Sequence, residues 1–174
     1  MAMNLIPADP RTKAVVHYVI SHTDPDKLGA TKLNKVLWRA DVEHYRRFGH
    51  TITGQMTYVR MPQGPVPNFV EEVLSELKAE KLIVERDGKA FDYARREFVW
   101  LDKARPTNFT AEQVEIILEA ISTICKKTAN AASDETHDAL WGEIPNGQQM
   151  PVRAASVRPS QLNPSDIEWA LANG

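Results

Sequence analysis

The chain has 174 residues, of which 43% are hydrophobic and 25% are charged, and its formal net charge is -2. This length and apolar content favour one compact domain, or one domain followed by a short tail. The small net charge excludes a global attraction to nucleic acid or to anionic membranes, so any electrostatic recognition must be local. A single cysteine, Cys125, excludes an internal disulfide and a multi-cysteine metal site.

Targeting signals are not visible in the sequence. No apolar run approaches the roughly 20 residues that a membrane-spanning helix needs. The first ten residues, MAMNLIPADP, lack the basic segment followed by an apolar segment that marks a signal peptide. We therefore expect a soluble cytoplasmic protein.

Two helices are predicted at the start of the chain. Asp9 stands directly before a proline, which is the pattern of a capping side chain at a helix start, and predicts a helix over residues 10–22. The Thr-Asp-Pro-Asp segment at 23–26 then breaks it. A second helix is predicted over 31–48, with Gly49 as its C-terminal stop.

The second helix is predicted to have two apolar sides and one basic side. The first apolar side repeats at helical spacing and comprises Leu33, Val36, Leu37, Ala40, His44 and Phe48. The second apolar side comprises Trp38, Val42 and Tyr45. The third side carries Lys32, Lys35, Arg39 and Arg46, with Glu43 at its edge. A helix with two apolar sides packs against neighbours on both, so we expect this helix at the centre of the fold.

A strand, a rigid turn and a third helix are predicted next. Aromatic and β-branched residues favour a strand over 56–59. Gly64-Pro65-Val66-Pro67 predicts a stiff turn whose last proline fits the first turn of a helix. The apolar face predicted for that helix is Phe69, Val70, Val73, Leu74 and Leu77. Strands at 82–85 and 97–101 follow, with a turn signal in the segment 86–89.

The last part of the chain is predicted to be helical and then irregular. Thr110 and Gln113 form a capping box at the start of a fourth helix. Its predicted apolar stripe is Val114, Ile117, Leu118, Ile121 and Cys125, which places the cysteine in the core. Ser133 is predicted to cap a short helix through His137 and Trp141. After Gly142 the chain is rich in proline, and only residues 166–171 are expected to form further helical turns.

The order of these elements predicts a mainly α fold of the α+β class. We expect a compact helical domain over residues 1–150, with a small antiparallel sheet and a wing-like hairpin. Residues 151–174 are expected to form a C-terminal extension. A helix followed by a two-stranded hairpin is also typical of winged-helix proteins, which keeps a DNA-binding function open.

No pattern of residues predicts an enzyme, a metal site or a bound cofactor. His17 and His22 are close in sequence, as are His44 and His50, but no HExxH motif or cysteine cluster accompanies them. The sequence contains no GxSxG nucleophile elbow and no glycine-rich phosphate loop. Cys125 lies on an apolar stripe rather than at a helix N-terminus, where a thiolate would be stabilised.

Two features of the sequence have alternative interpretations. On the basic side of the second helix, Arg39 and Glu43 form either a solvated i, i+4 pair worth about 0.3–0.5 kcal/mol, or part of a contact surface that includes Arg46. Such a surface would meet an acidic partner protein or a nucleic-acid backbone. His137 and Trp141, also at i and i+4, are either a packing pair or an anchor at an interface.

Four short motifs together resemble the Panacea domain, the family of SocA-like and GepA-like antitoxins. They are Lys32-Leu33-Asn34-Lys35-Val36-Leu37-Trp38 continued by Ala40-Asp41, Phe48-Gly49, Gly64-Pro65-Val66-Pro67, and Thr136-His137 with Trp141. The family pattern is a KLxKLLYxA-type helix, a tyrosine-containing strand, a GPVx turn and a terminal Thr-His…Trp segment. Trp38 stands where tyrosine is usual, and Val36 replaces a leucine. The resemblance extends from about residue 13 to residue 150.

This resemblance implies an antitoxin of a bacterial or prophage type II toxin–antitoxin system, which neutralises a cognate protein toxin by direct binding. For some members it also implies an adaptor that delivers the toxin to a protease such as ClpXP. The family-motif residues that it implies for partner binding are Lys32, Lys35, Trp38, Asp41, Gly64, Pro65, Val66, Pro67, His137 and Trp141. The alternative is a winged-helix transcriptional regulator with nucleic acid as its partner. Neither hypothesis involves a membrane or a cofactor, and the oligomeric state, including a homo-oligomer, stays open.

Overall fold

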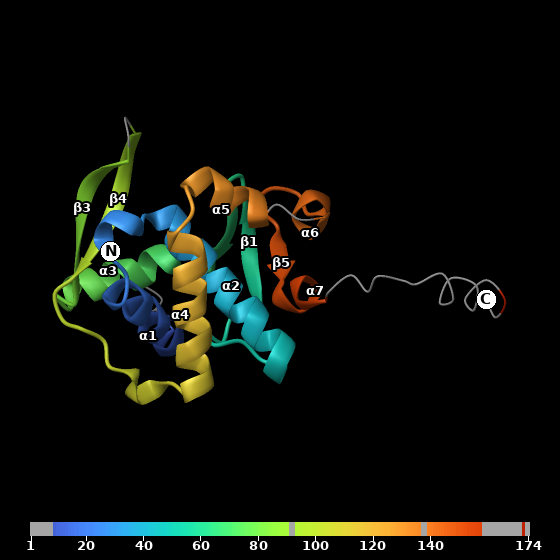
Figure 1. The fold of residues 1–174 in the computed structure, drawn as a ribbon, viewed down its shortest axis with the longest axis horizontal. Helices are drawn as coiled ribbons and strands as arrows, with labels where there is room; N and C mark the ends of the chain where they lie inside the picture. The colour runs from blue at the N-terminus through green and yellow to red at the C-terminus, as the bar shows by residue number, and fades with distance from the viewer. Residues whose placement is uncertain (1–8, 91–92, 137–138, 158–171, 173–174) are drawn as a thin grey trace, which may run out of the picture.

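The computed structural model describes residues 9–90, 93–136, 139–157 and 172, and α2 lies at the centre of the fold (Figure 1). The helices packed against α2 (Ala30–Phe48) include α1 (Pro10–Ser21), α4 (Ala111–Cys125), α5 (Ala129–Thr136) and α7 (Val152–Ser156). The central helix and its stop are confirmed, because Gly49 ends α2 in the left-handed conformation with a φ of 75°. Asp9 also caps α1 as predicted, accepting a hydrogen bond from the Thr12 N–H.

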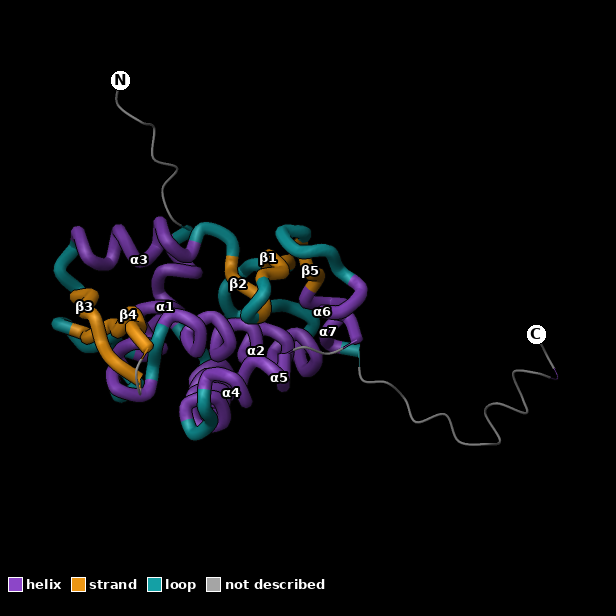
Figure 2. Tube along the Cα trace, turned by 90° about the horizontal axis from the view of Figure 1, so that it is seen from above, coloured by secondary structure: helices purple, strands orange, loops and turns teal. Residues whose placement is uncertain are grey.

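A three-stranded antiparallel sheet covers one side of α2, with α4 on the other side (Figure 2), and α5 contacts both α2 and β2. Its strands, in spatial order, are β2 (Gly64–Pro67), β1 (Thr57–Met61) and β5 (Gln149–Pro151). Tyr58 on β1 is opposite Met150 on β5, and both side chains are fully buried. The sequence predicted β1 but not β5, since three residues are too few to show a strand pattern.

The segment Gly64–Pro67 is a strand and not the turn that the sequence predicted. Two prolines are tolerated because β2 lies at the edge of the sheet. They occupy alternate positions, so the N–H groups that β2 donates to β1 must come from Gly64 and Val66. The turn itself consists of Pro62 and Gln63, which connect the paired residues Met61 and Gly64.

The third helix confirms most of its predicted apolar face. Val70, Val73, Leu74 and Leu77 of α3 (Val70–Ala79) are all buried. Phe69 was predicted wrongly, because it precedes the helix in the left-handed conformation, with a φ of 59°, and its side chain is 58% exposed. Proline at 67 therefore ends a strand, and the helix begins only after this left-handed residue.

A second hairpin lies at the opposite end of the molecule from β5 and α7 (Figures 1 and 2). It consists of β3 (Ile83–Ala90) and β4 (Tyr93–Trp100), which are longer than the two strands predicted. The turn signal at 86–89 was wrong, because these residues continue β3. A Cβ atom at Gly88 would lie 2.0 Å from the carboxyl group of Glu97 on β4, so that side chain would have to move to make room for it.

The fourth helix keeps its predicted start but turns a different face to the core. The capping box of Thr110 and Gln113 is confirmed in both directions. The buried stripe is Gln113, Ile116, Ile117, Ala120, Ile121 and Ile124. Leu118, predicted to be buried, is 42% exposed, and Cys125 is only half-buried. Because isoleucines occupy adjacent stripes of α4, the sequence alone does not decide which face packs on the core.

Short elements complete the fold. They are the 3₁₀ turns η1 (Pro25–Lys27) and η2 (Pro106–Asn108), and the helix α6 (Ala139–Glu143). Ser133 does not cap a helix, because it lies inside α5, where Thr128 accepts a hydrogen bond from the Ala131 N–H. Phe48, placed on the apolar side of α2, is 48% exposed at the end of that helix. His137 and the helical turns expected at 166–171 lie outside the described residues.

These elements confirm a mainly α fold of the α+β class with small antiparallel sheets. The core is continuous from α1 through α2 to the inner face of the three-stranded sheet, where Tyr58, Met150 and Val152 are fully buried. β5 and α7 belong to this packing, although they follow residue 148.

Candidate functional site

A buried carboxylate joins the family-motif part of α2 to the chain that follows it. Asp41 has no exposed surface. Its Oδ1 atom accepts hydrogen bonds from the backbone N–H groups of Ile52, at 2.7 Å, and Thr53, at 3.0 Å. Its Oδ2 atom accepts from the Thr53 hydroxyl, at 2.5 Å, and from the Tyr58 hydroxyl, at 2.7 Å. Four donors therefore hold the loop before β1, and β1 itself, against the helix.

The charge of Asp41 is balanced between burial and hydrogen bonding. Burial raises the pKa of the Asp41 carboxyl, and the four hydrogen bonds act in the opposite direction by favouring the carboxylate. Burial and the neighbouring Asp41 also raise the pKa of the Tyr58 phenol well above its usual value. Trp38, buried on the same helix, packs edge-on against Tyr58 with ring centroids 5.0 Å apart. Asp41 and Trp38 thus face the interior of the protein.

Two further buried polar side chains of α2 contact backbone carbonyl groups of the chain that follows the helix. His44 is 2% exposed, and its Nδ1 atom lies 2.6 Å from the carbonyl oxygen of His50. Burial lowers the pKa of His44, which favours the neutral ring. Lys35 is 1% exposed, and its ammonium group donates a hydrogen bond to the carbonyl oxygen of Gln63 in the β1–β2 turn. The sequence placed Lys35 on the basic side of the helix, and the structure buries it there.

The other cations of α2 do not form one continuous basic surface. Arg46 pairs with Glu43, and its Nε–H donates a 3.1 Å hydrogen bond to the carbonyl oxygen of Ser156. Arg47 also pairs with Glu43, at 2.7 Å. Lys32 and Arg39 are half-buried, and burial lowers the pKa of Lys32. Much of the charge on this side of the helix is therefore engaged within the protein.

Trp141 contacts the end of β1, next to the β1–β2 turn. Its indole N–H donates a 3.3 Å hydrogen bond to the carbonyl oxygen of Met61. The guanidinium group of Arg60 lies 3.7 Å from the centre of the Trp141 ring, and also approaches the side-chain oxygen of Asn146 at 3.4 Å. Trp141 is thus a structural contact of the hairpin, whereas its predicted pairing with His137 falls outside the described residues.

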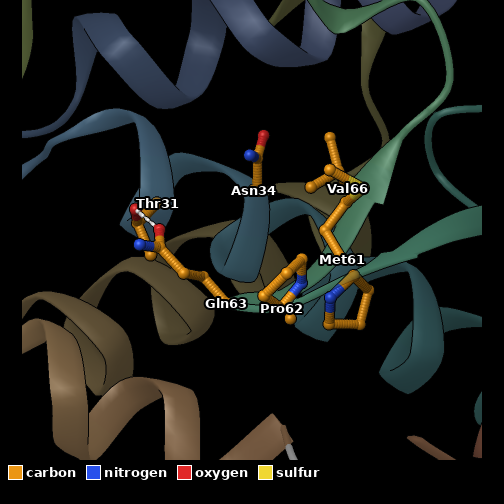
Figure 3. A pocket seen from close by; sticks show the side chains of 8 residues that line it. Thr31, Asn34, Met61, Pro62, Gln63 and Val66 are labelled. Atoms are coloured by element: carbon orange, nitrogen blue, oxygen red, sulfur yellow. Dashed lines mark hydrogen bonds between the residues drawn. The ribbon is translucent and has the colours of Figure 1, made fainter. Parts of the chain in front are cut away.

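A surface pocket lies between the first half of α2 and this hairpin (Figure 3). It has a volume of about 320 Å³ and is lined by Thr31, Asn34, Met61, Pro62, Gln63, Gly64, Pro65 and Val66. The Thr31 hydroxyl donates to the side-chain oxygen of Gln63 at 2.9 Å across one side of the pocket. The side chain of Asn34 points away from the axis of α2, and its amide makes no hydrogen bond within the described part of the chain. Gly64, Pro65 and Val66 are the predicted partner-binding residues that reach this pocket.

The remaining candidates for catalytic chemistry are the histidines and the cysteine of the described residues. Among them, no group of three or more His, Cys, Asp or Glu side chains could hold a metal ion. His17 contacts the carbonyl oxygen of Asp102, and His22 stacks on Tyr18, so both act in packing. Burial raises the pKa of the Cys125 thiol, which disfavours the reactive thiolate.

The motifs of α2, the β1–β2 hairpin and α6 match a known protein family. Residues 33–142 match the family model of the SocA-like antitoxin, Panacea domain. The chain belongs to the Panacea-domain family of SocA-like antitoxins. No curated protein and no solved structure matches the chain.

The Panacea match covers most of the hairpin seat, by which we mean α2, β1, β2 and α6. β5 and α7 follow the matched residues, yet they complete the sheet and pack on α2. Sequence reasoning missed three contributors to this region, namely Tyr58, Thr53 and Gln63. Tyr58 could have been found as the tyrosine of the family's strand, but nothing local marks Thr53 or Gln63, whose roles depend on residues distant in the sequence.

The winged-helix alternative is disfavoured by charge in this Panacea domain. The helix that precedes the β3–β4 hairpin is α3, and its outer side carries Glu71, Glu72 and Glu76. Glu71 pairs with Arg96 and Glu76 pairs with Lys13, so this helix does not offer the basic surface that binds a phosphate backbone. None of the described helices is both long enough and apolar enough to cross a membrane.

Proposed function

We propose that this protein is the antitoxin of a bacterial type II toxin–antitoxin system and neutralises a cognate protein toxin by direct binding. The observation that carries the proposal is the family match over residues 33–142. Binding, rather than chemistry, also agrees with a site whose polar residues are occupied in holding the fold. Its setting would be the bacterial cytoplasm, with a toxin encoded next to the antitoxin, in a prophage or in the chromosome.

The hairpin seat supports this proposal through its rigidity. Separate hydrogen bonds from Asp41, Lys35 and Trp141 fix the loop before β1, the β1–β2 turn and the end of β1. A surface that is already ordered loses little conformational entropy when a partner binds. The motif residues would therefore act mainly by positioning a contact surface, and the domain that carries it would extend through α7.

Co-expression tests the proposal directly. The neighbouring gene is induced in a bacterial host with and without this protein, and colony formation is measured. We expect the neighbouring product to stop growth alone and to be harmless when both are present. If it is harmless alone, or remains lethal with this protein present, the antitoxin assignment is wrong.

A second measurement separates occlusion from delivery to a protease. Neutralisation is compared in hosts with and without ClpXP, while the amount of toxin is followed by immunoblotting. An adaptor gives rapid loss of toxin that requires the protease, whereas occlusion leaves both the toxin level and the protection unchanged in its absence. Either result identifies the mode of action, because the two differ in the fate of the toxin.

A further inference from the structure

We infer that the pocket between α2 and the β1–β2 hairpin receives an uncharged, apolar side chain of the toxin. This inference rests on the proposed function and specifies its binding surface. It follows from the charge, the size and the surroundings of the pocket, each of which restricts the class of occupant.

The pocket carries no charge. None of its eight lining residues is ionisable, although a quarter of the chain is charged. Lys35, on the same part of α2, directs its ammonium group to the carbonyl oxygen of Gln63 and is 1% exposed. A phosphate, a carboxylate or a cation would therefore lose its hydration without gaining a partner of opposite charge. An uncharged group is the complement of this surface.

The size of the pocket fits one or two side chains. Its volume of about 320 Å³ is at the lower end of the roughly 300–1,000 Å³ typical of ligand pockets. Half of its lining residues are the apolar Met61, Pro62, Pro65 and Val66. Met61 is 40% exposed, which leaves a polarizable side chain at the rim to adapt to the shape of an inserted group. Such a site suits a single anchoring residue of a protein interface.

Polar groups around the pocket can order the backbone next to that anchor. The Asn34 amide has both a donor and an acceptor, and it makes no hydrogen bond within the part of the chain that the structure describes. Strand addition to β2 is disfavoured, because Pro65 and Pro67 remove the N–H groups that an added strand would need. The anchor would therefore come from a helix or a loop of the toxin.

The test measures binding of the purified antitoxin to the purified product of the neighbouring gene by calorimetry. Met61→Glu places a charge at the rim, and Asn34→Arg fills the pocket with a large cation. Leu118→Glu is the matched control, because Leu118 is 42% exposed and lies on α4 outside the pocket. Thermal unfolding of each variant must match the wild type, so that a loss of binding cannot come from a loss of fold.

We expect each pocket variant to weaken binding at least about 10-fold, and the control to change it less than about 2-fold. If the wild type binds and both pocket variants bind equally well, the pocket is not the contact and the antitoxin function stands. If the wild type does not bind, the proposed function fails and this inference fails with it. A dimer of this chain that Met61→Glu dissociates would also overturn it, because the occupant would then be a second copy.

Discussion

The two hairpins of this protein are held in place by different physical means. The β1–β2 hairpin is fixed by buried hydrogen bonds from α2, chiefly those of Asp41 and Lys35. The β3–β4 hairpin has Ile83 and Phe98 in the core, but its side-chain polar contacts are ion pairs whose cations reach solvent, such as Arg86 and Arg96, with side chains 52% and 37% exposed. Buried bonds define one position and resist salt, whereas exposed pairs are weaker and respond to pH and ionic strength. The hairpin beside the candidate contact surface is the one with the more rigid support.

The largest expected effect tests the buried support. Asp41→Ala removes the acceptor of four hydrogen bonds and leaves the Tyr58 hydroxyl and the Thr53 N–H buried without their partner. We expect a loss of about 3–5 kcal/mol in the free energy of unfolding, measured by urea denaturation. Asp41→Asn, which keeps the shape and one acceptor, should lose less. A loss below about 1 kcal/mol for the alanine variant would show that the cluster does not hold the hairpin.

An intermediate effect concerns Gly88 in the second hairpin. The carboxyl group of Glu97 covers this residue and is held there by Arg86 at 2.8 Å and by Arg95. Gly88→Ala should therefore cost about 1–3 kcal/mol, because the carboxylate must leave its partners to make room for the methyl group.

A double-mutant cycle gives the control for this prediction. In a Glu97→Ala background the clash disappears, and Gly88→Ala should be neutral or stabilise by up to about 1 kcal/mol, because alanine restricts the unfolded chain. Equal costs in both backgrounds would mean that space beside the carboxylate is not the reason for glycine.

The smallest expected effect is the pH dependence of the second hairpin. Hydrogen bonds from Arg96 and Lys78 lower the pKa of Glu85 from 4.5 to about 2. Because the folded pKa lies below the unfolded one, the stabilisation is complete above pH 4.5 and is lost as the pH falls toward 2. We expect a loss of only about 1 kcal/mol, since exposure of the two cations screens the pairs.

The difference between the wild type and Glu85→Gln isolates this contribution from those of other groups. Their unfolding free energies should converge between pH 4.5 and 2, while the Asp41 cluster contributes equally to both proteins. A constant difference across this range would contradict the role of Glu85.

The elements predicted correctly are those whose start or end is marked by a few neighbouring residues. The start of α1 at Asp9, the length of α2, its stop at Gly49 and the capping box of α4 follow from a few neighbouring residues. The sequence could not predict that Gly64–Pro67 is a strand, because prolines are compatible with a turn or an edge strand, and the choice depends on the partner strand.

The candidate site was predicted in part. The family motif led to Asp41, Lys35 and Trp141, but the sequence placed Lys35 with the other cations of the helix and did not predict its burial. Its burial depends on an acceptor, the Gln63 carbonyl, that lies 28 residues away in the chain. Such long-range hydrogen bonds leave no periodic signal, and the pocket beside them is likewise a property of the assembled elements.

The pairing of β1 with β5 has a consequence for synthesis of the protein. Residues 57–61 leave the ribosome long before residues 149–151, and at about 5–20 residues per second the delay is on the order of 10 s. During that time β1 can pair only with β2, and its second edge, beside Tyr58, lacks the cover that Met150 later provides. The nascent antitoxin therefore passes through a stage with an open strand edge, a form on which a chaperone could act before the sheet closes.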